Sequence, residues 1–231
     1  MTEITIAAAD GGKFMGYLAT PKSGKGPGVV VIQEIFGVNR VMRDLADGLA
    51  QQGYTALCPD LFWRQEPGIQ LTDKTDAEWA RAFALYKGFD EAKGAEDLTA
   101  TIAHLRTLPS CAGKVGTVGY CLGGKLAYLT ATRTDADCAV GYYGVGIESA
   151  LGEAHAIKHK LMLHIAEQDE YCPPPAQAQI KAALAGNSHV TLHSYPGMNH
   201  AFARPGGQHY DKASAELANG RTSAFFKQHL G

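Results

Sequence analysis

A cysteine between two glycines, in the stretch GYCLG at 119–123, is the residue of this chain best suited to do chemistry. A short apolar run precedes the stretch and a helix-forming segment follows it, which predicts a strand, a sharp turn and a helix. Gly119 and Gly123 suit such a turn, because a side chain at either position would collide with the neighbouring strand or helix. Cys121 would then stand at a helix N-terminus, whose free N–H groups and partial positive charge favour a thiolate nucleophile.

Two other interpretations of this stretch stay open. Residues 119–125 nearly match a phosphate-binding loop, but Leu126 stands where that loop needs Ser or Thr to hold a metal. Cys121 is otherwise a structural cysteine in a Gly-rich turn, because most free cysteines are simply buried. The chemistry therefore depends on whether the rest of the chain supplies partners for the thiol.

A cysteine nucleophile needs a base and a group that orients the base. In a sheet with such a turn, the chain order is nucleophile, acid and histidine. Asp169 comes just after the predicted strand 160–166, and His200 comes just after the predicted strand 190–195. Both residues are therefore expected in loops at the carboxyl ends of strands, with Asp169 orienting His200 as the base.

Neighbouring residues offer alternatives. Asp169 could only form a turn or cap a helix, and Glu167 and Glu170 are other candidates for the acid. His155 and His159 have the i, i+4 spacing of a metal pair, but no third ligand lies nearby in the sequence. A solvated helix face is the expected setting of these two histidines.

The predicted elements alternate between strands and helices. Strands are predicted at 3–8, 14–20, 28–34, 54–58, from 115 to the turn at 119–123, 139–143, 160–166 and 190–195, and helices at about 39–52, 75–88, 91–108, from the turn to about 132, 174–185 and about 209–229. Residues 60–74 are expected to be irregular. The pattern predicts an α/β fold, with a mostly parallel, doubly wound sheet, an N-terminal antiparallel hairpin and helices on both faces. Ligands of such sheets bind at the carboxyl ends of the strands, where Cys121 would lie.

Size and composition limit the classes of protein. The 231 residues are 45% hydrophobic and 19% charged, which predicts a single domain over 1–231. A net charge of −2 without a basic stripe argues against nucleic acid or a membrane as partner. No signal-peptide pattern or membrane-length apolar run occurs in the sequence. Five scattered cysteines without a CxxC pair argue against a disulfide framework or a zinc site and predict a cytoplasmic protein.

Several motifs in one order, spread over nearly the whole chain, make this sequence similar to the dienelactone hydrolase family. The matching segments are QEIFGVN at 33–39, YTALCPD at 54–60, VGYCLGG at 118–124, AVGYYGVG at 139–146, QD at 168–169 and HAFAR at 200–204. That family is a branch of the α/β-hydrolase fold with cysteine in place of the usual serine. The resemblance implies an α/β-hydrolase fold and hydrolysis of carboxylic esters, with ring opening of dienelactones or other enol lactones as the expected reaction.

The resemblance also implies a role for individual residues. Cys121 would be the nucleophile, His200 the base and Asp169 its orienter. Glu34 would lie close to the thiol and pair with Arg204 while the site is empty. A substrate carboxylate would compete for the arginine, and the released glutamate would take the thiol proton. A nearby negative charge would keep the thiol protonated until substrate arrives.

The expected mechanism is acyl transfer through a covalent acyl-enzyme. The thiolate attacks the carbonyl, and the backbone N–H groups of Ile35 and Leu122 form the oxyanion hole. An enol is a good leaving group, and water activated by the histidine then releases the acid. No metal or organic cofactor is required.

Some positions depart from the family's pattern. Without gaps, Trp79 and Phe83 fall where the family has the arginine and tyrosine of a substrate-carboxylate clamp, and Arg81 reaches that place only with a register shift. Ala201 stands where the family often has Ser. The candidate substrate-binding residues are Arg204, Arg81, Phe36, Tyr86, Tyr143 and Phe202. The four aromatic residues among them could line a more apolar pocket or simply pack in the core.

Three other functions stay open beside the lactone hydrolase. The chain could be a general carboxylesterase for small aryl esters, with the clamp lost. It could be a non-catalytic protein that binds a small ligand, or a thiol redox protein, although no obvious resolving cysteine stands near Cys121. The expected partner is a small ester or lactone, and the expected state is a monomer or a weak homo-oligomer.

Overall fold

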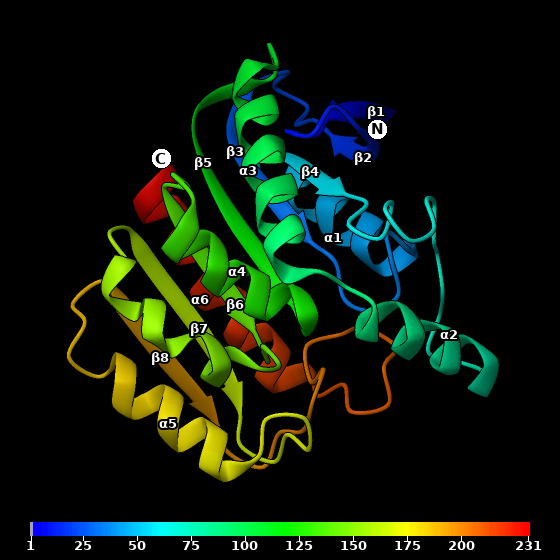
Figure 1. Ribbon diagram of the computed structural model, residues 1–231. Helices are drawn as coiled ribbons and strands as arrows, with labels where there is room; N and C mark the ends of the chain where they lie inside the picture. The colour runs from blue at the N-terminus through cyan, green and yellow to red at the C-terminus, as the bar shows by residue number, and fades with distance from the viewer. Residues whose placement is uncertain (1) are drawn as a thin grey trace. The chain divides into compact units, whose positions relative to one another are not determined.

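The computed structural model describes residues 2–231 (Figure 1). The chain divides into two compact units, Met1–Thr117 and Val118–Gly231. Within the described residues, eight strands form a mostly parallel sheet that starts with an antiparallel pair, and helices alternate with these strands along the chain. The predicted α/β class with an N-terminal hairpin is confirmed.

In the first unit the strands lie in the order β1-β2-β4-β3, with β3 and β4 parallel. Their bounds are β1 Thr2–Ala7, β2 Lys13–Ala19, β3 Gly26–Ile32 and β4 Thr55–Pro59. The hairpin between β1 and β2 turns at Gly11, which has a φ of 89°. The Asp10 carboxylate accepts the Gly12 N–H at 3.2 Å, as expected for an Asx turn.

Strand β3 is shorter at its carboxyl end than the predicted strand 28–34. It ends at Ile32, so Gln33 and Glu34 follow the strand instead of belonging to it. The Gln33 side chain explains this, because its oxygen accepts the Leu61 N–H at 3.0 Å and its NH₂ group donates to the Glu34 carbonyl at 3.3 Å. These buried contacts hold the chain where it leaves the sheet.

The helices of the first unit are α1 Arg40–Gln51, α2 Asp76–Lys87 and α3 Glu91–Thr107. Each starts directly after a polar N-cap residue whose side chain accepts N–H groups of the first turn; these residues are Asn39, Thr75 and Asp90. The segment 60–74 lies between β4 and α2 without helix or regular strand, as predicted.

Strand β5, Cys111–Tyr120, begins in the first unit and ends in the second, and starts four residues before the predicted position 115. The later elements are α4 Leu122–Arg133, β6 Cys138–Tyr142, the 3₁₀-helix η1 Ile147–Ala156, β7 Lys160–Ala166, α5 Pro174–Leu184, β8 Val190–Tyr195 and α6 Lys212–Leu230. Strands β6, β7 and β8 are parallel neighbours, and α6 packs against β6 and β7 (Figure 1). Parallel neighbours place the carboxyl ends of β6, β7 and β8 at one edge of the sheet.

The prediction that His155 and His159 share one helix face is wrong. His155 lies in η1, which ends at Ala156, so His159 falls outside it. The His155 ring bonds to the Gly152 carbonyl at 2.9 Å within its own turn. A 3₁₀-helix has three residues per turn and gives no 3.6-residue period, so the sequence did not predict η1.

The length of the helices and the state of the cysteines can be compared with the expectations from composition. Among the described residues, no helix has both the length and the apolar character needed to span a bilayer. The cysteines are present as free thiols: Cys58, Cys111, Cys121, Cys138 and Cys172.

Candidate active site

Cys121 occupies the sharp turn between β5 and α4. Its φ of 57° and ψ of −116° lie outside the usual regions for a residue with a side chain, a conformation that costs about 1–3 kcal/mol. The side chain is partly exposed, unlike those of the other cysteines. The predicted arrangement of strand, turn and helix is confirmed.

The glycines make this turn possible. A Cβ on Gly119 would lie 1.8 Å from the Gly123 carbonyl oxygen, and a Cβ on Gly124 would lie 2.4 Å from the Tyr142 carbonyl oxygen. The Cys121 N–H donates to the same Tyr142 carbonyl at 3.1 Å. The turn is therefore packed, backbone against backbone, on the end of β6.

The same turn does not cradle a phosphate. The N–H groups of Gly124 and Lys125 are directed to the Cys121 carbonyl, at 2.9 and 3.3 Å. The Lys125 ammonium donates to the Ser149 hydroxyl at 3.0 Å. Leu122, the first residue of α4, has an N–H with no acceptor within the helix, as at every helix start.

Asp169 lies in the loop after β7 and is 2% exposed. One carboxylate oxygen, Oδ1, accepts the Tyr171 N–H at 2.8 Å, and the other, Oδ2, accepts Nδ1–H of His200 at 2.8 Å. The residue thus forms a local turn and also contacts the histidine. Of the alternatives, Glu170 is exposed, and a carboxylate oxygen of Glu167 lies 3.9 Å from the Lys181 ammonium.

His200 follows β8 and is buried. Burial lowers the pKa of His200, but the charge of Cys121 and the hydrogen bonds to Asp169 and Cys121 outweigh it and raise the pKa to about 10. The imidazole ring packs against the rings of Tyr143 and Tyr171, with centroids 5.2 and 4.9 Å away. Cys121, His200 and Asp169 thus lie in one chain of contacts, and the raised pKa favours the imidazolium form of His200.

Backbone strain is concentrated at this chain of contacts. Among the described residues, the non-glycine residues with positive φ are Cys121, Tyr143 and Ala201, at 57°, 37° and 61°. Tyr143 contacts the His200 ring and Ala201 directly follows it. Strain of this kind often accumulates where a structure must fix functional groups.

The remaining candidates of the second unit are Phe202 and Arg204, which follow His200 closely in the chain. Phe202 is fully buried, with its ring centroid 5.7 Å from that of Tyr143 and 4.7 Å from that of Tyr195. Phe202 therefore packs on Tyr143, whose ring in turn contacts His200. The Arg204 N–H donates to the Ala201 carbonyl at 2.9 Å, which closes a turn after the histidine.

The first unit holds the other candidates. Glu34 and Ile35 are buried directly after β3, 1% and 5% exposed. Tyr86 is half-buried on α2. The structure therefore places Glu34 and Ile35 just beyond the carboxyl end of a parallel strand.

An aromatic cluster of the first unit, Phe36–Trp79–Phe83, includes the two positions where the family has its clamp. The Phe36 ring meets Trp79 edge-on at 5.0 Å, and Trp79 stacks on Phe83 at 5.5 Å. Arg81 is exposed and forms an ion pair with Glu66.

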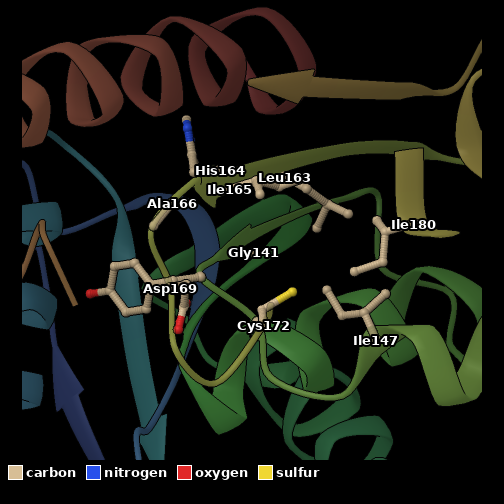
Figure 2. Close-up of a pocket in the computed structure, with 11 residues that line it drawn as sticks. Gly141, Ile147, Leu163, His164, Ile165, Ala166, Asp169, Cys172 and Ile180 are labelled. Atoms are coloured by element: carbon tan, nitrogen blue, oxygen red, sulfur yellow. The ribbon is translucent and has the colours of Figure 1, made fainter. Parts of the chain in front are cut away.

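A small cavity lies beside Asp169 (Figure 2). Its volume of about 10 Å³ leaves room for one water molecule. Figure 2 shows the Cys172 sulfur directed toward Ile147 and Ile180. Burial, with the charges of Asp169 and Glu148, raises the pKa of Cys172 to about 12, so this cysteine stays a neutral thiol. Among the described residues, no group of three His, Cys, Asp or Glu side chains could hold a metal ion.

Sequence reasoning missed two residues of this region. Tyr171 packs on His200, and its only signal is its position two residues after Asp169. Gln177 is a buried polar residue in line with Ile180 and Leu184 on α5. A glutamine at an apolar position of a helix was the available signal for Gln177.

Comparison with known proteins agrees with the fold and the motifs. A model of the "Dienelactone hydrolase family" matches residues 14–230. The chain is 54% identical to the "Putative carboxymethylenebutenolidase" of Azospirillum brasilense, over 100% of both chains, and 40% identical to the carboxymethylenebutenolidase of Pseudomonas putida, over 96% of this chain and 94% of that one. The crystal structure titled "Putative Dienelactone Hydrolase" from Klebsiella pneumoniae has a TM-score of 0.85 and 27% identity, covering 98% of each chain.

The fold is that of an α/β-hydrolase, as its structural neighbours show. The chain belongs to the dienelactone hydrolase family and is a carboxylic ester hydrolase.

Proposed function

We propose that this hydrolase opens enol lactones of the dienelactone type, with Cys121 as nucleophile, His200 as base and Asp169 as its orienter. The observation that carries the proposal is the 2.8 Å contact between His200 Nδ1 and Asp169 Oδ2, on a histidine that also hydrogen-bonds to Cys121. A base held in this way has its tautomer fixed by the carboxylate. The names of relatives such as the carboxymethylenebutenolidase of Pseudomonas putida support the lactone as substrate class.

The first half of the reaction forms a thioester. The Cys121 thiolate attacks the lactone carbonyl, and the N–H groups of Leu122 and Ile35 stabilise the oxyanion. When the ring C–O bond breaks, the enolate leaves and takes a proton, which the His200 imidazolium can supply. The opened chain stays attached to sulfur.

The second half hydrolyses the thioester. His200, now neutral, takes a proton from water, whose oxygen attacks the thioester carbonyl. The C–S bond breaks, the product leaves as a carboxylic acid, and the thiolate and imidazolium are restored. Asp169 stabilises the imidazolium in both halves.

Glu34 and Arg204 control the state of the thiol in this proposal. A substrate carboxylate binds Arg204, and Glu34 then accepts the thiol proton, as the family resemblance implies. When the product leaves, Glu34 returns this proton to the sulfur and pairs with Arg204 again. The burial of Glu34 supports the role, because a buried carboxylate is costly and responds strongly to a change of partner.

A second function is favoured by the Phe36–Trp79–Phe83 cluster. Aromatic residues in place of an arginine and a tyrosine suit a neutral, apolar acid or alcohol part. The alternative is therefore a carboxylesterase for small aryl esters, with the same three residues as machinery.

One comparison of substrates decides between the two. We expect kcat/KM for a carboxylate-bearing lactone to exceed that for its neutral methyl ester, and Arg204→Ala to raise KM for the acidic substrate more than for the neutral one. Equal values for both substrates, with Arg204→Ala affecting both alike, would favour the aryl esterase.

A cytoplasmic location, a single domain over 1–231 and a monomer or weak homo-oligomer stay predictions.

A further inference from the structure

The loop that carries Asp169 has little structure of its own. It connects β7 to α5, and its last residue, Pro173, has no N–H group. The Asp169 N–H donates to the Ala166 carbonyl at a long 3.4 Å, and the Tyr171 N–H donates to the Asp169 carboxylate itself. Other groups must therefore hold the loop in place.

The side chain of Gln177 bonds to both ends of this loop. Gln177 is 4% exposed and lies in the first turn of α5. Its Nε2 lies 2.7 Å from the Cys172 carbonyl oxygen, 3.1 Å from that of Ala166 and 3.3 Å from that of Glu167. Since an amide NH₂ group has two hydrogens, its two donors are shared among three carbonyls, and the shortest bond is the one to Cys172. One amide thus joins the start of the loop to its end.

The same loop is tied to the segment that carries His200. The Gln168 N–H donates to the Met198 carbonyl at 2.8 Å, and the Glu167 N–H donates to the Tyr195 carbonyl at 3.2 Å. Glu167 and Gln168, which make these two bonds, are joined to Asp169 through the backbone of the loop, and the Asp169 carboxylate contacts His200. The conformation of the loop therefore determines the geometry between the carboxylate and the imidazole.

We propose that Gln177 is a positioning residue for hydrolysis, which acts by holding the Asp169 loop in the conformation that orients His200. The inference rests on the proposed function of Asp169 and His200. Gln177 touches neither substrate nor reacting atoms in this role. Removing its donors takes the 2.7 Å hydrogen bond from the buried Cys172 residue, breaks the side-chain link between the two ends of the loop and lets the loop shift.

Gln177→Met tests the role most simply, because methionine has a similar length and no donor. The matched control is Gln179→Met, an exposed glutamine two residues further on the same helix. We expect kcat of Gln177→Met to fall by roughly ten- to hundred-fold with KM little changed, because a misplacement of about 1 Å can cost about 10²-fold. Gln179→Met should keep the wild-type values.

The titration of His200 separates positioning from mere stability. We expect its pKa, followed by NMR, to be lower in Gln177→Met than in the wild type, because the contact with Asp169 is weakened. A folded Gln177→Met with kcat within twofold of the wild type and an unchanged His200 titration would overturn the proposal, even if its Tm were lower.

Gln177→Glu keeps the test decisive if Gln177→Met does not fold. Its carboxylate would face three carbonyl oxygens, while its protonated form can donate one hydrogen bond. We expect the ratio of its kcat to the wild-type kcat to rise as the pH falls, and a ratio independent of pH would overturn the proposal.

His200→Gln distinguishes failure of the proposed triad from failure of the role of Gln177. Wild-type turnover in His200→Gln contradicts the proposed triad. An inactive His200→Gln together with a fully active Gln177→Met contradicts only the role of Gln177.

Discussion

Two cysteines of the second unit, Cys121 and Cys172, differ in exposure and in the groups around them. Cys121 is partly exposed, lies at a helix N-terminus and contacts an imidazole. Cys172 is buried beside a carboxylate, and its pKa is raised to about 12. Burial and the neighbouring carboxylate keep Cys172 a neutral thiol, whereas Cys121 is partly exposed and contacts a histidine, so Cys121 suits the role of nucleophile better than Cys172.

Cys121→Ala should abolish ester turnover and leave the fold intact, because it removes only the sulfur. Cys138→Ala is the matched control, since Cys138 is a buried cysteine of β6 in the same unit. We expect the control to keep its turnover and to lose stability on the order of 1 kcal/mol. Steady-state kinetics with circular dichroism checks both, and turnover by Cys121→Ala would remove this residue from the mechanism.

Asp169→Asn should lower the pKa of His200, because it removes a charge and weakens a hydrogen bond that raise it. The folded pKa of about 10 lies above the ordinary value of a histidine, about 6.5. The stabilisation from protonated His200 is therefore complete below about pH 6.5 and is lost as the pH rises through about 10. In Asp169→Asn this loss should come at lower pH, as measured by NMR titration and by urea unfolding at several pH values; an unchanged pKa would contradict the contact.

At the scale of elements, the sequence predicts the strands that carry the acid and the base at their observed bounds. Strands β7 and β8 run over 160–166 and 190–195. β7 is an apolar run that ends before polar loop residues, and Pro196 and Gly197 mark the end of β8. The sequence does not predict η1, which has no 3.6-residue period. Chain order predicts Asp169 and His200 as acid and base. The bonds made by Gln177 depend on how a loop folds back on a helix, which periodicity does not encode.

Gly119→Ala should destabilise the turn that holds Cys121, because its methyl group would lie 1.8 Å from the Gly123 carbonyl oxygen. We expect a loss of about 1–3 kcal/mol in the free energy of unfolding, together with a large loss of activity. Gly220→Ala in α6 is the control, since no atom lies within 4 Å of its added Cβ. That change should be neutral or stabilising by up to about 1 kcal/mol, and a Gly119→Ala protein as stable as the control would contradict the packing argument.

At the scale of the whole molecule, the motifs predicted the fold and the family, which the structural and sequence relatives confirm. Recognition of the substrate is less determined by the sequence. The family's clamp positions hold Trp79 and Phe83, and the structure shows that these residues form an aromatic cluster with Phe36. Whether such a cluster binds an apolar group depends on its fit to a ligand, which residue types alone do not specify.

The most direct test of a thiol mechanism is the mass of the covalent intermediate. In His200→Gln the base that activates water is missing, so hydrolysis of the thioester should be slow. After this variant reacts with p-nitrophenyl acetate, intact-protein and peptide mass spectrometry should show one acetyl group, attached to Cys121. An acetyl group on another residue, or release of p-nitrophenol at the wild-type steady-state rate without any adduct, would contradict the account.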